Sequence, residues 1–294
     1  MQDGKLLRFA NSFGAKYVHI KTLSGLSGLF CRPLWAFRFE ALKRMAGLYA
    51  VQRLAKHAYK MSSGSEQVIA SIYDIEYQGN RPNYMYLNAL LFPEQFNKIT
   101  GIAAPKLNDL QIIDIGAGSN ELLRFLHHQF GVNSRQLHGT DISPASTAII
   151  RANGFHGYTG RIEHLGFPTN HFDLAFLSYF LDFDTDQEKT FEEAVRITKP
   201  NGEIILEGKF PAYPFGVPAA DRKHLNFLTK GKDACEDIEL VFRALMQIAS
   251  VQNKSISLQR IIRSERYVFS RYGLCRLPSF FLVMKISASR QVED

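Results

Sequence analysis

The stretch IIDIGAGSNE, residues 112–121, decides how this chain folds. Its first half is a short apolar run of the kind that forms a buried strand. Its second half contains Gly116 and Gly118, which let the backbone turn sharply and let a ligand approach closely. Because ligands of open α/β sheets bind at the carboxyl ends of the strands, this stretch predicts a nucleotide pocket.

The loop lacks the features of two common phosphate-binding motifs. A dinucleotide fingerprint would require a glycine at position 121, where this chain has Glu121. A negative side chain is poorly placed beside a pyrophosphate, and a phosphate loop of the Walker type is also absent. The sequence therefore argues against NAD and FAD as the bound nucleotide.

From residue 110 onward, short β-rich runs alternate with helical stretches. Strands are predicted at residues 110–115, 136–141, 172–178 and 202–207, and helices at residues 121–130, 143–153 and 187–198. A helix at residues 235–250 and two strands at residues 255–268 and 280–287 complete the pattern. Such alternation indicates βαβ crossovers and a mostly parallel sheet.

An acidic residue, Asp141, ends the second predicted strand. A carboxylate at a strand tip can accept hydrogen bonds from both hydroxyls of a ribose. The same residue could instead cap the helix that begins near Ser143 and Pro144. The two roles are compatible, so Asp141 remains a candidate ribose ligand.

These motifs resemble those of the class I S-adenosylmethionine (SAM)-dependent methyltransferases. Residues 114–118 are similar to the first motif of that family, and residues 167–182 resemble the segment that runs into its fourth strand. Residues 196–206 resemble the turn into its fifth strand. The resemblance implies SAM as the cofactor, with these cofactor-binding residues: Asp114, Gly116, Gly118, Asp141, Ile142, Arg161, Ile162 and Leu177.

The resemblance also implies a fold and a domain organisation. The expected fold is α/β, with a Rossmann-like, seven-stranded, mostly parallel sheet whose last strand is antiparallel. Residues 1–107 would form a helical N-terminal extension and lid, with one long helix at residues 33–60. Residues 108–294 would form the methyltransferase-like core, with an insertion at about residues 211–233.

Two positions depart from the family pattern. Asn120 stands where the family often has a third glycine. Arg161 stands where the family often has an acid that pairs with the adenine amine. The Arg161 guanidinium could stack on the adenine, or the neighbouring Glu163 could be its polar partner.

Methyl transfer from a sulfonium is an in-line displacement, so the protein mainly has to position and desolvate the reactants. A general base is needed only if the acceptor loses a proton. By location, the catalytic candidates are Tyr179, Asp182 and Glu207, and the acceptor-binding candidates are Tyr73, Tyr77, Arg81 and His224. Structural roles compete with these, since Asp182 could cap a helix and Glu207 could be a solvated strand end.

The net charge of +7 is distributed unevenly along the chain. Residues 1–62 hold eleven Lys and Arg against two acidic residues, whereas the remainder has a small acidic excess. This basic, aromatic segment could close over a small molecule, contact a second protomer or lie on an anionic membrane surface. Nucleic-acid binding is disfavoured, because the basic excess does not extend over the chain.

The composition also limits which classes of protein this chain can belong to. The chain has 294 residues, of which 46% are hydrophobic and 21% charged, a composition typical of globular proteins. No apolar run in the sequence is long enough to cross a membrane as a helix. The N-terminus does not resemble a secretory leader, so we expect a cytoplasmic protein, with peripheral membrane contact left open. Three widely separated cysteines and no convincing ligand spacing predict neither disulfides nor a metal site.

The sequence therefore predicts a SAM-dependent methyltransferase that acts on a small, bulky or apolar metabolite. One alternative is a non-catalytic protein that keeps the nucleotide fold and recruits a partner or a membrane through its basic arm. Another alternative is a methyltransferase that acts on RNA or protein. The acceptor, the methylated atom, a second reaction such as cyclisation and the oligomeric state are left open.

Overall fold

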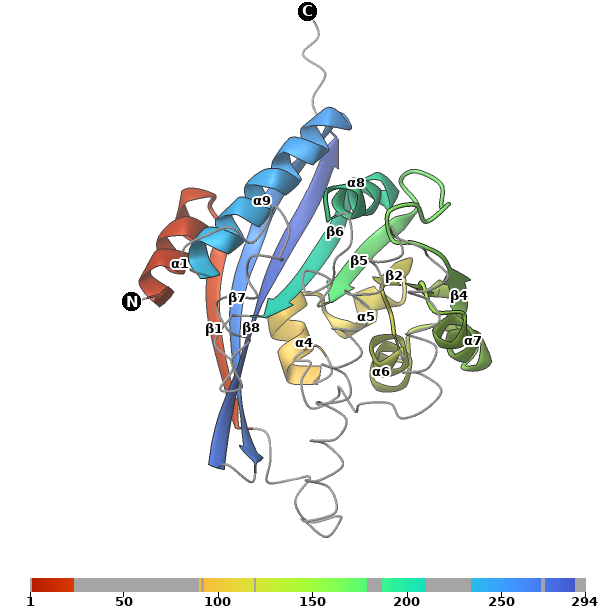
Figure 1. The fold of residues 1–294 in the computed structure, drawn as a ribbon, viewed down its shortest axis with the longest axis horizontal. Coiled ribbons are helices and arrows are strands. Elements are labelled where there is room, and N and C mark those ends of the chain that lie inside the picture. The colour runs from red at the N-terminus through yellow and green to blue at the C-terminus, as the bar shows by residue number, and fades with distance from the viewer. Residues whose placement is uncertain are drawn as a thin grey trace, which may run out of the picture.

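The computed structural model describes residues 2–23, 90, 93–118, 120–178, 187–209, 234–270 and 273–288. Within these residues the strands form one eight-stranded sheet with helices on both faces (Figure 1). The strand order is β1-β7-β8-β6-β5-β2-β3-β4. Strand β8 runs antiparallel to its neighbours β6 and β7, whereas the other neighbouring pairs are parallel.

The strands are β1 (Lys16–Leu23), β2 (Ile112–Ile115), β3 (Leu137–Asp141), β4 (His156–Thr159), β5 (Phe172–Ser178), β6 (Thr198–Lys209), β7 (Lys254–Ser270) and β8 (Gly273–Ala288). The helices are α1 (Gln2–Ser12), α4 (Pro93–Thr100), α5 (Ala104–Leu107), α6 (Glu121–Phe130), α7 (Pro144–Ala152), α8 (Gln187–Ile197) and α9 (Ala234–Val251). A 3-10 turn, η3 (Ser134–Gln136), leads into β3. The predicted fold class, with its antiparallel last strand, is confirmed.

The N-terminal strand β1 was not predicted. Its residues were assigned to a helical extension, but they pair in parallel with β7 and add an eighth strand to the seven expected. The run Tyr17-Val18-His19-Ile20 contains the β-branched and aromatic residues that favour strands, and Ile20 is buried. The helix predicted at residues 33–60 lies outside the described residues.

Asp3 holds α1 against this added edge of the sheet. Its carboxylate accepts hydrogen bonds from the Tyr17 hydroxyl of β1 and from Nη1 of Arg263 on β7, the latter at 3.0 Å. The Tyr17 hydrogen bond and the nearby Arg263 charge lower the pKa of Asp3 despite partial desolvation. The first helix and strand are therefore tied to the carboxyl-terminal half of the chain.

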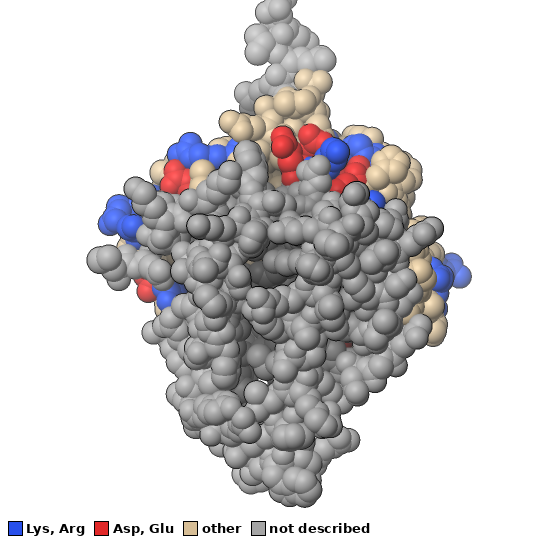
Figure 2. All heavy atoms as spheres, viewed as in Figure 1, with Lys and Arg blue, Asp and Glu red and all other residues tan. Residues whose placement is uncertain are grey.

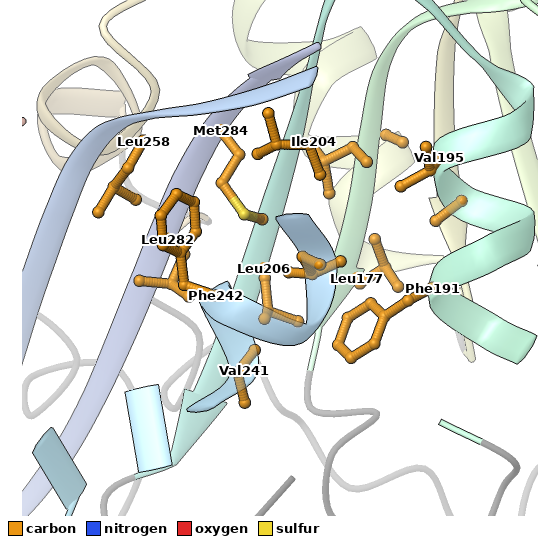
Figure 3. Close-up of a cluster of buried hydrophobic side chains, with 14 of the residues drawn as sticks. Leu177, Phe191, Val195, Ile204, Leu206, Val241, Phe242, Leu258, Leu282 and Met284 are labelled. Atoms are coloured by element: carbon orange, nitrogen blue, oxygen red, sulfur yellow. The ribbon is translucent and has the colours of Figure 1, made fainter. Parts of the chain in front are cut away.

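Two apolar layers enclose the sheet. One face packs against α1, α8 and α9, and Figure 3 shows its centre, where side chains from β5 to β8 meet those of α8 and α9. Phe242 of α9 contacts Phe13 of α1 edge to face, with ring centroids 5.0 Å apart. The opposite face is covered by α4, α5, α6 and α7, and includes Phe96, Phe176 and Phe281.

Lys254 closes the carboxyl end of α8. Its side chain is buried, and Nζ donates to the carbonyls of Val195 at 2.6 Å and Thr198 at 2.8 Å. Replacing Lys254 with methionine should lower the free energy of unfolding by about 2 kcal/mol, because buried carbonyls lose their donor. Urea denaturation would measure the change. Lys98→Met, at an exposed position, is the control, and equal stability of the two variants would contradict the prediction.

Candidate cofactor site

The loop after β2 adopts left-handed backbone conformations at three positions. The φ angles are +75° at Gly116 and +53° at Gly118, which explains the two glycines, since a side chain is strained there. Asn120, with φ of +59°, begins α6 in the same conformation. Asparagine tolerates this conformation better than most non-glycine residues, which accounts for Asn120 at a position where glycine would also be favoured.

Asp141 fastens this loop to the tip of β3. Its Oδ2 accepts the Gly118 N–H at 2.9 Å, and its Oδ1 accepts the Ser143 N–H at 2.9 Å. Each carboxylate oxygen has a second lone pair, so both oxygens can also accept a ribose hydroxyl. The helix N-cap is Ser143, whose hydroxyl accepts the Ser146 N–H at 3.1 Å. The capping role considered for Asp141 therefore belongs to its neighbour.

The segment after β4 lies beside the loop. A Cβ placed on Gly116 would lie 3.6 Å from Cδ1 of Ile162, and the Gly160 N–H donates to the Asp141 carbonyl at 3.0 Å. Arg161 and Glu163 form an ion pair at 2.8 Å. The structure thus places Ile162 beside the predicted pocket. Arg161 and Glu163, the two residues considered as adenine contacts, instead form an ion pair with each other.

Three carboxylates gather around the loop after β2 that contains Gly116 and Gly118, called the glycine loop below. Asp114 is buried on β2, and its burial, reinforced by the negative charges of Glu121 and Asp141, raises its pKa to about 7. Glu121 was not among the predicted site residues, although its place in the first helical turn after the loop is a signal that the sequence contains. Such a site favours a cation, and SAM carries a sulfonium and an ammonium group. The residues present therefore fit this cofactor.

The neighbouring strand β5 ends level with the loop, and β6 continues two residues beyond that level. Leu177 is buried and pairs with Ile115, and the following Ser178 pairs with Glu207, which is fully buried. A buried carboxylate excludes the solvated strand end that was one reading of Glu207. The remaining predicted candidates lie outside the described residues: Tyr179, Asp182, Tyr73, Tyr77, Arg81 and His224.

Comparison with known proteins identifies the family. Residues 113–206 match a family model described as a methyltransferase domain. The chain contains a class I SAM-dependent methyltransferase domain. This confirms the predicted family and its methyl donor, and it places the glycine loop and Asp141 within the matched segment.

Similar proteins share parts of this methyltransferase domain. The ubiquinone/menaquinone biosynthesis C-methyltransferase UbiE of Legionella pneumophila (strain Corby) is 28% identical over 136 residues, covering 43% of this chain and 54% of that protein. An arsenite methyltransferase of Aquipseudomonas alcaligenes is 28% identical over 121 residues, covering 36% and 35%. A SAM-dependent methyltransferase structure from Methanosarcina mazei has a TM-score of 0.45 and 17% identity, covering 68% and 99%. The chain spans about half or less of the two curated relatives.

The described residues contain neither a metal-binding cluster nor a membrane-spanning helix. No group of three or more His, Cys, Asp or Glu side chains in that part of the chain is arranged to hold a metal ion. None of the helices described is both long and apolar enough to span a bilayer. The expectation of a metal-free site remains a prediction.

Proposed function

We propose that this protein transfers a methyl group from SAM to a small, apolar acceptor. The observation that carries the proposal is the Asp141 carboxylate, held by the Gly118 and Ser143 N–H groups beside the left-handed loop. This carboxylate is positioned before any ligand arrives, so binding a ribose there requires little reorganisation. The carboxyl edge of β2 and β3 is also where ligands of parallel sheets bind.

The acidic groups suit a sulfonium donor. SAM, when bound, supplies an electrophilic methyl group whose leaving group is a neutral thioether. The carboxylates of Asp114, Glu121 and Asp141 favour the cationic donor over its neutral sulfide product. Most of the remaining work is alignment and exclusion of water, which can lower the barrier by about 7 to 11 kcal/mol.

The surroundings of the loop support a small apolar acceptor. On the face that carries Asp114, the sheet is backed by a buried apolar layer in which Phe96 of α4 packs on Phe176 of β5, with ring centroids 6.2 Å apart. Among the described residues visible at the edge of Figure 2, basic and acidic side chains are interspersed. The curated relatives in the comparison include, by name, a quinone-biosynthesis C-methyltransferase and an arsenite methyltransferase, so they share a reaction type rather than an acceptor.

The acceptor class can be tested by following the methyl label. The protein would be incubated with methyl-labelled SAM and a cell extract, and the label would be counted in the organic-soluble, RNA and protein fractions. We expect label in the organic-soluble fraction, and none with the Asp141→Ala variant as the blank. Label found in RNA or protein would contradict the small-acceptor assignment and support a macromolecular methyltransferase.

Residues 2–23 form α1 and β1 and belong to the sheet rather than to a lid. The proposal extends to residues 24–62, whose basic and aromatic composition supports a lid over the acceptor, with a second protomer or an anionic membrane surface as other partners. The division at residue 107 and the cytoplasmic location likewise remain proposals.

A further inference from the structure

Alternation along β5 and β6 assigns Ser178 and Glu207 to one face of the sheet. Phe176 and Ile205, two residues earlier on each strand, belong to the apolar layer under α4 and α6. Glu207 pairs with Phe281 of β8, which belongs to the same layer. Because side chains two residues apart on a strand share a face, Ser178 and Glu207 lie on the same side as Asp114.

The same two residues are level with the start of the glycine loop. Leu177 of β5 pairs with Ile115 of β2, so the next residue, Ser178, lies at the level of Gly116. Ser178 in turn pairs with Glu207 of β6, so Gly116, Ser178 and Glu207 form one row across the three strands. Neighbouring strands are about 4.8 Å apart, which places the Glu207 backbone about 10 Å from the loop. A carboxylate at this distance can face an acceptor that lies beside the cofactor.

Polar side chains replace apolar ones at this level of the sheet. Glu207 is fully buried and pairs across the sheet with Phe281. The Ser178 hydroxyl is buried and makes no hydrogen bond, a cost that an apolar residue would avoid. Two residues earlier on each strand, the same face carries the apolar residues Phe176 and Ile205.

We propose that Glu207 accepts the proton that the acceptor loses, and that Ser178 orients the reacting group. This inference rests on the proposed methyl transfer and specifies its substrate class: an apolar molecule that is methylated at a hydroxyl or an amine. The oxygen or nitrogen lone pair forms the new bond to the methyl carbon, and the methyl–sulfur bond breaks with its electrons left on sulfur. The displaced proton goes to a Glu207 carboxylate oxygen.

A cofactor analogue tests this role without knowledge of the acceptor. Sinefungin carries an amine-bearing carbon in place of the methylated sulfur, so its ammonium group marks the position of the transferred methyl. A carboxylate facing that position should bind it. We expect Glu207→Gln to weaken sinefungin binding by about tenfold relative to S-adenosylhomocysteine, measured by calorimetry.

Glu203→Gln is the matched control. Glu203 lies on the same strand and face, but it pairs with Leu174, at the opposite end of β5 from Ser178. We expect the sinefungin to S-adenosylhomocysteine affinity ratio to remain unchanged in this variant. An unchanged ratio in Glu207→Gln, with normal S-adenosylhomocysteine binding, would overturn the inference and leave the cofactor assignment intact. Failure of wild-type protein to bind S-adenosylhomocysteine would overturn the proposed function as well.

Discussion

Replacing Asp141 with alanine is expected to reduce the affinity for SAM and for S-adenosylhomocysteine by at least about 100-fold. Two ribose hydroxyls lose a charged acceptor, and each such hydrogen bond contributes roughly 1.5 to 3 kcal/mol. The substitution also releases the Gly118 N–H, so the loop loses the contact that holds it to β3. Both effects act on the cofactor site, and isothermal titration calorimetry would measure them together.

Controls separate this effect from unfolding. Asp109→Ala removes an exposed carboxylate before β2 and should leave the affinity unchanged. Thermal melting would show whether the Asp141→Ala variant is folded at the temperature of the titration. An affinity within threefold of wild type, for a folded variant, would exclude Asp141 as the ribose ligand.

The affinity for SAM should rise with pH because Asp114 must ionise. Its pKa in the ligand-free protein is about 7, raised by burial and by the charges of Glu121 and Asp141, so the carboxyl is mostly neutral at pH 5.5. The cationic cofactor favours the ionised form, and binding therefore releases a proton. Between pH 5.5 and 7.5 the affinity should increase by about 10- to 30-fold, since the limiting slope is tenfold per pH unit.

Two comparisons identify the group responsible. S-adenosylhomocysteine has no sulfonium charge, so its affinity should change less over the same range. The Asp114→Asn variant cannot ionise at this position, and its affinity for SAM should be nearly independent of pH. A wild-type affinity that is flat, or that falls as pH rises, would contradict this electrostatic account.

The same pKa shift has a consequence for stability. The folded-state pKa of Asp114 lies above the ordinary value of 3.8, so the folded protein binds this proton more tightly than the unfolded chain does. In the absence of cofactor, this group therefore reduces stability as the pH rises from about 4 to 7. Ionisation of Asp114 thus lowers the stability of the cofactor-free protein and raises its affinity for SAM.

The sequence predicted the parallel core well because its elements are strongly patterned. The predicted strand at 172–178 and the predicted helix at 121–130 have the observed bounds. Strand β4 was missed because its residues are mostly exposed, so apolar alternation is absent. Strand β1 was missed because its pairing with β7 joins segments more than 200 residues apart, which no local pattern reports.

The cofactor site was predictable only where it depends on local sequence. Gly116, Gly118 and Asp141 follow strands, so a motif places them at the correct edge of the sheet. The charge of Glu121 raises the pKa of Asp114 to an extent that depends on the burial of Asp114 and on the path of the loop between them, and a local sequence pattern gives neither. The common row of Ser178 and Glu207 depends in the same way on the register between β5 and β6.

A crystal structure of the protein with S-adenosylhomocysteine tests the central claim most directly. We predict that both ribose hydroxyls lie within hydrogen-bonding distance of the Asp141 carboxylate, with the glycine loop against the ligand. The homocysteine sulfur should lie on the side of β5 and β6. A ligand bound at another place, with no contact between its ribose and the Asp141 carboxylate, would contradict the account.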